Sequence, residues 1–596
     1  MCRIFGSFAV AATGAELATV SARQRHGGPD DRGVLTGRGW SLGCDRLAVT
    51  DPAGGAQPFT LPTAPGVLAV LNGEIYNHRE LRGQLTARGH RFPDRCDGSL
   101  LPALYTEFGP GFADLLDGMF AIAVLDLRER RPQLVLAVDG MGMKPLHYHQ
   151  GPRGAVRFAS EIPALLAFDG VPIAPREDTL DTVLSTRTPF GTETALREIR
   201  VLPPGSVAVA RGSEGLRMLR CGPRAAAPRT GPAPSATDVL DTLRHEVHRL
   251  ADMDLPLCAL TSGGLDSALV TALAAEHAEP LHTFHLGYRG RWPGAEDTYA
   301  KAVARRARTR HHQVAVDPAE LPSLLTRTVR HLGQPNADPI TVSTYALFRA
   351  VREAGFTAAL TGDGADELFG GYDRIGAALA APAGTDWTVA YADALAAAPR
   401  LLREWLYTAE YRAFIAERGS AADRITAELR ACGTERADAL QRFETRRRLP
   451  AYHLRRVDHL SMAWAVETRM PFCQPDVVRL ARRLPIELRT GKRALYEAGR
   501  ELLPAATLRR PKQPFTLPLS AMLAVDGPLL WTLRELLSPA RLRGTGQLRA
   551  DRVQALFARH AERPSEQDAL ALWALGVHEL WTDVVQGFRV STGLAA

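Results

Sequence analysis

The chain has 596 residues, more than one hydrophobic core normally organises, so we expect at least two domains. Its composition, 45% hydrophobic and 23% charged, is that of an ordinary globular protein, and no run reaches the about 18 apolar residues of a membrane span, which argues against a membrane partner. The net charge of +7 comes from scattered arginines without a basic run interleaved with aromatics, which argues against a nucleic-acid partner.

The seven cysteines are odd in number, sparse, and nowhere spaced as CxxC. This pattern argues against a disulfide framework and against a zinc site. The N-terminus has no basic region followed by a long apolar stretch, as a secretory signal would have. We therefore expect a cytoplasmic protein.

The N-terminal third is predicted to be a strand-rich domain that extends to residue 210. Short apolar stretches between glycine turns predict strands at 46–49, 66–71 and 133–138, and helices at 79–88 and 100–107. Residues 211–235, where Pro, Gly, Arg and Ala cluster, are predicted to form a linker.

Candidate catalytic groups of this region begin with Cys2. Removal of Met1 would make Cys2 the first residue, and an α-amino group with a pKa near neutrality can act as the base for its own thiol. Asn72 and Gly73 follow an apolar strand and offer a side-chain amide and a backbone N–H suited to an oxyanion hole. Arg46 can hold a substrate carboxylate and Asp97 a substrate ammonium, so the pair suits an amino acid.

Beyond the linker, strands near residues 257, 281, 312 and 357 alternate with helical stretches, which predicts βαβ units and a parallel sheet. The strand at 257–260 runs into a Ser-Gly-Gly-Leu-Asp-Ser loop and then a helix, an arrangement typical of an anion site. Its glycines let backbone N–H groups approach a phosphate, its serines add hydroxyl donors, and its aspartate suits a Mg²⁺ ion shared with the phosphates. The loop residues concerned are Ser262, Gly263, Gly264, Asp266 and Ser267.

A second buried strand at 357–360 ends in another glycine loop, which carries Asp363, Asp366 and Glu367. In a doubly wound sheet, loops at the carboxyl ends of neighbouring strands converge on one crevice, so Asp266 and Asp366 are expected to share one metal ion. From about residue 380 the pattern is almost all helical. Lysine occurs only at positions 144, 301, 492 and 512, and a lysine in so arginine-rich a chain is a candidate for a role that a bulky guanidinium cannot fill.

Together these residues resemble the glutamine-dependent asparagine synthetase family over nearly the whole chain. The resemblance implies a class II glutamine amidotransferase domain at 1–210, with the αββα layers of the N-terminal-nucleophile (Ntn) hydrolase type. For 236–596 it implies a doubly wound parallel α/β ATP-pyrophosphatase domain with a helical C-terminal region. The segments that carry the likeness are Cys2, 28–30, 46–47, 57–58, 72–77, 117–121, 142–146, 159–161, 262–267, 361–372, 456–458, 461–463, 467–472, Lys492 and 510–512.

The resemblance implies a two-site reaction: glutamine gives up ammonia at one site, and ATP with Mg²⁺ adenylates a small carboxylic acid at the other, where ammonia then forms the amide. The implied glutaminase residues are the nucleophile Cys2, the oxyanion donors Asn72 and Gly73, and the glutamine-positioning Arg46, Glu74 and Asp97. The implied synthetase residues are the loop 262–267, the metal-holding Asp266 and Asp366, the catalytic Asp363 and Lys492, and the nucleotide contacts Leu260, Leu286, Thr361 and Gly362. The family leaves a homodimer open.

The chain also departs from the family pattern. Family members often read Cys-Gly-Ile and His-Arg-Gly-Pro-Asp, where this chain has Arg3 and Gly27 at the variable places. The usual Pro-Phe-Leu-Asp ends here in Gln474, and the usual Glu-Pro begins with Gln334. Each of these last two changes removes a negative charge, which leaves an acceptor other than aspartate open.

Three alternatives remain beside the amidotransferase. A lactam or macrolactam cyclase of the same family would use an internal amine, but Cys2 and Asp363 oppose it. An RNA-modifying ATP pyrophosphatase would need the CxxC or basic patch that is missing. A non-catalytic scaffold is opposed by the retention of Cys2, Asp266, Asp366 and Lys492 together.

Overall fold

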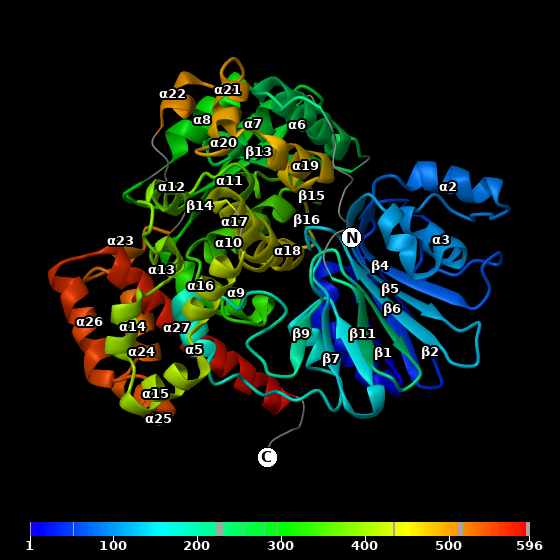
Figure 1. Ribbon diagram of the computed structural model, residues 1–596, viewed down its shortest axis with the longest axis horizontal. Coiled ribbons are helices and arrows are strands. Elements are labelled where there is room, and N and C mark those ends of the chain that lie inside the picture. Colours follow the sequence, from blue (N-terminus) through cyan, green and yellow to red (C-terminus); the bar gives the residue numbers. More distant parts are fainter. Residues whose placement is uncertain are drawn as a thin grey trace.

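The computed structural model describes residues 2–51, 53–221, 231–253, 255–278, 280–294, 296–432, 435–510 and 517–591. Its strands form two antiparallel sheets in the N-terminal part of the chain and one parallel sheet later, with helices around them (Figure 1). This arrangement confirms the expected mixed α/β class with a parallel sheet. No helix within the described ranges is long and apolar enough to cross a membrane.

The two antiparallel sheets pack face to face. The first has the order β2 (Asp31–Gly37), β3 (Trp40–Arg46), β1 (Cys2–Phe8), β8 (Val156–Ala159), β7 (His147–Gln150), β9 (Ile199–Val201). The second has the order β11 (Leu216–Arg220), β10 (Val207–Arg211), β6 (Gln133–Val138), β5 (Gly118–Asp126), β4 (Val67–Ile75). Side chains of both, such as Ile4, Leu42, Val70 and Ala123, share one apolar core.

Helices cover the outer faces of these two sheets. α2 (His78–Ala87) and α3 (Leu101–Phe108) pack on the second sheet, while α1 (Gly14–Gln24) and α4 (Ile162–Leu165) pack on the first. The result is a helix–sheet–sheet–helix stack. Because successive side chains of a strand point to opposite faces, Cys2 and Ile4 of β1 face the second sheet, and Arg3 and Phe5 face the rest of the molecule.

The parallel sheet has the order β14 (Arg310–Val316), β13 (His282–Tyr288), β12 (Leu257–Leu260), β15 (Ala358–Leu360), β16 (Glu467–Arg469). Its strands alternate along the chain with α6 (Ala236–Ala251), α7 (Leu265–Ala275), α8 (Asp297–Arg306), α9 (Leu321–Leu332) and α10 (Ile340–Glu353). Ala259 of β12 lies opposite Leu360 of β15, so the loops that leave these two strands start side by side.

The remaining helices surround the parallel sheet and make up the rest of the molecule beside the two antiparallel sheets (Figure 1). They are α5 (Thr179–Thr186), α11 (Ala365–Leu368), α12 (Asp373–Ala380), α13 (Trp387–Leu395), α14 (Arg400–Leu406), α15 (Ala409–Arg418), α16 (Ala421–Ala431), α17 (Arg436–Phe443), α18 (Arg455–Met462), α19 (Pro475–Arg483), α20 (Ile486–Arg489), α21 (Arg493–Gly499), α22 (Ala505–Arg509), α23 (Leu519–Met522), α24 (Leu530–Leu536), α25 (Pro539–Thr545), α26 (Ala550–Glu562) and α27 (Glu566–Ser591).

Most of the elements expected from sequence are present, with three corrections. The strand expected at 46–49 is wrong, because β3 ends at Arg46 and the Ala48 N–H donates to the Asp30 carboxylate instead of to a neighbouring strand. Within the expected linker, 216–220 form β11 on the edge of the second sheet, and 222–230 lie outside the described residues. The helical C-terminal region also contains β16, a strand of only three residues.

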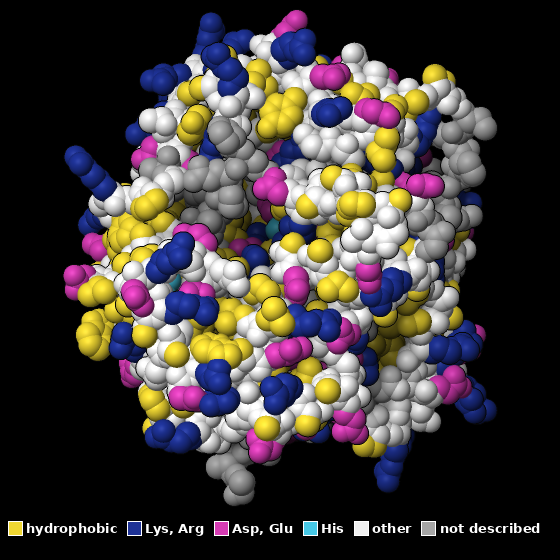
Figure 2. All heavy atoms as spheres, turned by 60° about the vertical axis from the view of Figure 1, so that its left-hand side comes forward, with side chains coloured by type: hydrophobic (Ala, Val, Ile, Leu, Met, Phe, Trp, Pro, Cys, Tyr) yellow, Lys and Arg dark blue, Asp and Glu magenta, His cyan; other side chains and the backbone are white. Residues whose placement is uncertain are grey.

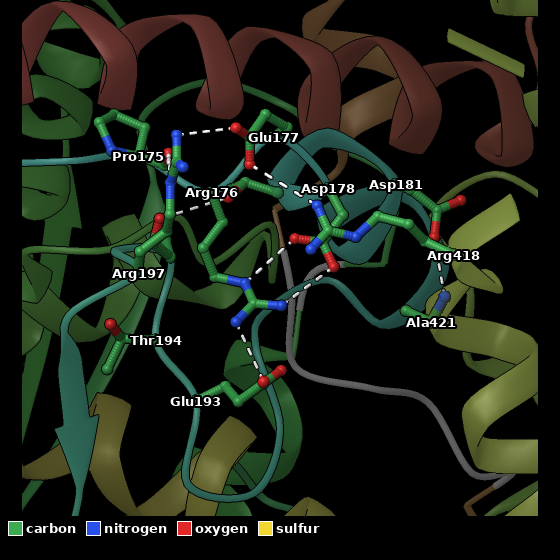
Figure 3. Close-up of polar contacts among 12 residues, drawn as sticks. Pro175, Arg176, Glu177, Asp178, Asp181, Glu193, Thr194, Arg197, Arg418 and Ala421 are labelled. Carbon is green, nitrogen blue, oxygen red and sulfur yellow. Dashed lines mark hydrogen bonds and ion pairs between the residues drawn. The ribbon is translucent and has the colours of Figure 1, made fainter. Parts of the chain in front are cut away.

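A segment before α5 ties the N-terminal part to the helices that follow (Figure 3). Glu177 pairs with Arg197 at 2.7 Å and with Arg418 at 3.8 Å, both near the surface. Asp181 is different because it is only 1% exposed. Its carboxylate accepts hydrogen bonds from the Ala421 N–H at 2.8 Å and the Tyr407 hydroxyl at 3.0 Å.

Replacing Asp181 with alanine should destabilise the protein, because two buried donors would lose their acceptor, at a cost of about 1–3 kcal/mol each. The urea midpoint of unfolding, followed by circular dichroism, should fall. Arg197→Ala removes an exposed ion pair and an exposed hydrogen bond to the Pro175 carbonyl, and should leave the midpoint nearly unchanged. Equal midpoints for the two variants would contradict this account.

Candidate functional site

The first candidate site surrounds Cys2 at the start of β1. The thiol is buried, the Gln57 side-chain amide donates a hydrogen bond to its sulfur at 3.2 Å, and the Cys2 N–H donates to Asn72 Oδ1 at 3.4 Å. Burial opposes ionisation, but the Cys44 thiol, the positive charge of the N-terminus, the Leu47 backbone and the Arg46 guanidinium outweigh it and lower the pKa of Cys2 to about 7. A thiol with this pKa is half ionised at neutral pH and is a competent nucleophile.

Asn72 and Gly73 lie next to Cys2 on β4. The Asn72 side-chain amide donates to Ser160 Oγ at 3.5 Å while its oxygen accepts from the Cys2 backbone. Gly73 has a φ of 145°, and a Cβ there would lie 1.9 Å from the carbonyl oxygen of Met119 on β5. Only glycine therefore fits at position 73, directly after Asn72 on β4.

The three predicted glutamine contacts are also close together. The Arg46 guanidinium is anchored on the carbonyls of Thr50 and Asp51, at 3.3 and 2.7 Å. Asp97 accepts from the Ile75 N–H at 2.8 Å, and burial together with the nearby Glu74 charge raises the pKa of Asp97.

Glu74 has a partner that sequence reasoning did not assign. Its carboxylate accepts two bonds, at 2.5 and 2.6 Å, from Arg469 of β16, and the Arg469 Nε lies 3.2 Å from Glu467. Burial and the Glu74 charge raise the pKa of Glu467 to about 8, so that side chain is protonated at neutral pH. The glutamine end of the candidate site thus touches the edge strand of the parallel sheet. Residues 467–472 belong to the segments that carry the family likeness. The sequence does not show, however, that Arg469 contacts Glu74, which lies 395 residues earlier in the chain.

The second candidate site lies where β12 and β15 end. Gly264 precedes α7, which places Asp266 in the first turn of that helix, and the Ser262 and Ser267 hydroxyls lie 3.0 Å apart across the loop. Gly263 has a φ of 78°, and a Cβ there would lie 2.5 Å from the Cβ of Tyr299. The predicted loop therefore adopts a conformation that requires glycine, with its N–H groups at a helix N-terminus.

Lys492 joins the two loops. Its ammonium lies 2.6 Å from Asp266 Oδ2 and 2.7 Å from Asp366 Oδ1, as the predicted convergence of the loops requires. Burial opposes the charge, but the two carboxylates outweigh it and raise the pKa of Lys492. The backbone of Lys492 has a φ of 57°, a left-handed value that is uncommon outside glycine and marks a constrained position.

The two carboxylates fit the predicted Mg²⁺ ion by their chemistry. Asp266 and Asp366 meet at one ammonium, so they are within reach of one shared cation, and carboxylate oxygens are ligands that Mg²⁺ prefers. Over the part of the chain that the structure describes, no group of three or more His, Cys, Asp or Glu side chains could hold a metal. A Mg²⁺ ion here would therefore take its further ligands from substrate phosphates or water.

A cavity of about 1010 Å³ contains this cluster. The face shown in Figure 2 is hollowed near its centre, where acidic, basic and histidine side chains are visible inside. Gly263 stands outside the lining. The predicted residues that line the cavity are Leu260, Ser262, Gly264, Asp266, Ser267, Leu286, Thr361, Gly362, Asp363, Asp366 and Lys492.

Five arginines line the cavity: Arg187, Arg374, Arg448, Arg456 and Arg510. Arg456 and Arg510 fall in segments that carry the family likeness, whereas the other three were not singled out from sequence. Arg456 pairs with Asp338, Arg374 lies 2.6 Å from Glu444, and the Arg187 guanidinium donates to the Tyr452 hydroxyl at 3.3 Å. Arginine is so abundant in this chain that no local pattern distinguishes Arg187, Arg374 and Arg448. Guanidinium groups at a cavity wall favour carboxylate or phosphate ligands.

The cavity also contains an acid held in its charged form. Glu367 accepts a hydrogen bond from the Tyr372 hydroxyl at 2.5 Å and lies 3.0 Å from His453. Burial opposes ionisation of Glu367, but the nearby His453 and Arg448 outweigh it and lower its pKa.

Gln474 and Gln334 do not line this cavity. Gln474 is buried at the start of α19, where its oxygen accepts from Arg249 at 3.2 Å, and Gln334 is buried between α9 and α10. The two lost negative charges therefore do not act on a ligand in the cavity by direct contact.

Comparison with known proteins supplies a family. The asparagine synthase family matches residues 238–583, and the glutamine amidotransferase domain family matches 1–217. A putative glutamine-hydrolysing asparagine synthetase of Mycobacterium bovis is 30% identical over 588 residues, which is 87% of each chain.

Two further relatives differ in how much they share. Asparagine synthetase 3 of Bacillus subtilis is 28% identical over 513 residues, or 82% of each chain. Asparagine synthetase 2 of rice is 30% identical over 390 residues, which is 62% of this chain, and the match spans only 60% of the rice protein's length.

Gly73→Ala should lower glutamate formation from glutamine by about 100-fold or more, because the added Cβ would displace the backbone N–H of the expected oxyanion hole. Pyrophosphate release with added ammonia should persist. Gly83→Ala is a matched control, since a Cβ on this α2 glycine would meet nothing within 4 Å. Wild-type glutamine hydrolysis in Gly73→Ala would show that Gly73 is not part of the site.

Proposed function

Because the chain belongs to the asparagine synthase family, we propose that it is a glutamine-hydrolysing carbon–nitrogen ligase that adenylates a carboxylic acid with ATP and amidates it with ammonia from glutamine. The observation that carries this proposal is the Lys492 bridge between Asp266 and Asp366, at the mouths of two glycine loops in one cavity. Residues 1–210 supply the glutaminase, of the Ntn-hydrolase type, and residues 236–596 supply the synthetase.

The glutaminase half begins with removal of Met1, after which the α-amine of Cys2 takes the thiol proton. The Cys2 sulfur attacks the side-chain amide carbon of glutamine, and the carbon–nitrogen bond breaks as the amine returns the proton to the departing ammonia. Water then hydrolyses the thioester to glutamate. Asn72 and Gly73 donate to the oxyanion that forms in both steps.

Glutamine is oriented by charge at its amino-acid end. Arg46, already anchored on two carbonyls, faces the carboxylate of glutamine. Glu74 and Asp97 face its ammonium. Arg469 offsets much of the Glu74 charge, so Asp97, whose raised pKa would fall when the ammonium arrives, carries much of this contact.

In the synthetase half, an oxygen of the acceptor carboxylate attacks the α-phosphorus of ATP and pyrophosphate leaves. Mg²⁺ bound by Asp266 and Asp366 supplies Lewis-acid polarisation of the phosphates. Lys492 offsets charge on the departing pyrophosphate. Ammonia then attacks the acyl carbon of the adenylate, AMP leaves, and Asp363 takes the surplus proton.

The acceptor is anionic, which the arginines of the cavity wall support. Because Gln474 and Gln334 lie outside the cavity lining, the identity of the acceptor depends on residues that face it, such as Arg187 and Arg456.

The proposal is tested with purified protein, glutamine, ATP and Mg²⁺, with aspartate or one of a panel of other small carboxylic acids. We expect glutamate, AMP and pyrophosphate to form together only when a suitable acid is present. If pyrophosphate is released with another acid and not with aspartate, plain asparagine synthesis is excluded. Pyrophosphate release without any use of glutamine or ammonia would favour a cyclase.

Cys2→Ala should abolish glutamate formation and keep pyrophosphate release with added ammonia, because only the first site needs the thiol. In the wild type, kcat/KM for glutamine should fall as the pH drops below the Cys2 pKa of about 7, since the thiol is then protonated, and should level off above it. Loss of both activities in Cys2→Ala, or a flat pH profile, would contradict the assignment.

A further inference from the structure

Arg3 follows the nucleophile directly in β1 but points to the opposite face of the sheet. Its side chain is fully buried. The nearest charges belong to Asp458 of α18 and Glu161 before α4, the first of which is 455 residues away in the chain. A buried guanidinium persists only with such partners, because an unpaired buried charge is costly.

The contacts of Arg3 form a closed network. Its Nη1 lies 2.7 Å from Asp458 Oδ2, its Nη2 donates to the Asp458 carbonyl at 3.3 Å, and its Nε lies 2.8 Å from Glu161. Lys144 approaches the other Asp458 oxygen at 3.0 Å, and His26 approaches Glu161 at 3.0 Å. Two cations thus balance two carboxylates, and burial, which opposes ionisation of Asp458, is outweighed by Arg3 and Lys144, which lower the pKa of Asp458.

The two departures from the family pattern near the N-terminus, Arg3 and Gly27, lie next to each other in space. A Cβ on Gly27 would lie 2.8 Å from the Arg3 Nε and 3.0 Å from its Cγ. Arg3 therefore occupies the space beside residue 27, where the family pattern places an arginine, and position 27 has become the glycine that position 3 would have carried.

The other end of this link reaches the cavity. Asp458 lies two residues after Arg456 on α18, and Arg456 lines the cavity and pairs with Asp338. Residues two apart on a helix face different directions, so α18 presents Arg456 to the cavity and Asp458 to Arg3. A short covalent and ionic path thus runs from the cavity wall through α18 to the strand that carries Cys2.

We propose that Arg3 is a positioning residue that couples the Cys2 strand to α18, so that filling the synthetase cavity changes the reactivity of Cys2. This inference rests on the proposed function for its two sites. In that function, Arg3 contacts neither glutamine nor ATP. Its role is to transmit a shift of α18 to β1, because separating Arg3 from Asp458 would leave buried charges unpaired.

The coupling is measured as the ratio of glutamate to AMP formed with glutamine, ATP, Mg²⁺ and the acid that is most active in the panel above. In the wild type we expect a ratio near one. Arg3→Met, which keeps side-chain length without charge, should raise the ratio by about 5-fold or more while each half-reaction continues. The exchange Arg3→Gly with Gly27→Arg should return it towards the wild-type value, since the guanidinium is restored in the same space.

Arg403→Met is the matched control. It removes another buried arginine, one that donates to the Ala398 carbonyl and lies 3.7 Å from Asp181, away from β1 and α18. If a general loss of stability caused the effect, the ratio of glutamate to AMP would rise in this variant too. We expect this ratio to stay at the wild-type value in Arg403→Met. An unchanged ratio in Arg3→Met, or an equal rise in Arg403→Met, would overturn the proposal.

A second measurement needs no turnover. The rate of Cys2 alkylation by iodoacetamide, followed by peptide mass spectrometry, should change on addition of ATP and Mg²⁺ in the wild type and not in Arg3→Met. If the rate of Cys2 alkylation in the wild type does not change when ATP and Mg²⁺ are added, the proposed coupling is overturned. Failure of the proposed function has a different signature, because the wild type would then form no AMP with any acid.

Discussion

Two buried arginine–carboxylate contacts hold the sites of this protein in place relative to one another. Arg3 meets Asp458, and Arg469 meets Glu74, each across some four hundred residues of chain. A charge taken out of water must be paired, and removing one partner of a buried pair is strongly destabilising, so these contacts tolerate little separation. One contact lies beside Cys2, the expected nucleophile, and the other at the expected glutamine-binding end, so the first site is built partly from the second half of the chain.

Sequence reasoning could predict the local parts of both sites. The glycine loop at 262–267 follows a buried strand, and its conformation depends on glycine at position 263, which the sequence shows directly. The meeting of Asp266 with Asp366 also follows from sequence, since it needs only the rule that loops after neighbouring parallel strands converge. Hydrophobic patterns of five or more residues similarly gave β4, β6, α2 and α3.

What sequence could not supply are contacts between distant segments. The family likeness includes residues 467–472, but nothing in that segment shows which residue Arg469 contacts, and its pairing with Glu74 appears only in the structure. The three-residue β16 is too short to show the alternating pattern that predicts a strand. The arginines of the cavity wall come from separate segments of the chain, so no local pattern could group them. The strand expected at 46–49 failed for the converse reason, because its apolar pattern was outweighed by a turn in which Asp30 holds the Ala48 N–H.

The late position of β16 in the chain has a consequence for biosynthesis. The parallel sheet is complete only when residues 467–469 pair with β15, a strand that lies about a hundred residues earlier in the chain. Long-range pairing of this kind is slow to form, and nascent chains fold from the N-terminus as they emerge. Until α18 and β16 have been made, Arg3 lacks Asp458 and Glu74 lacks Arg469, so the β-sheet stack around Cys2 lacks part of its support. The site around Cys2 therefore gains its last buried ionic contacts only when the second half of the chain has been made and has folded against it.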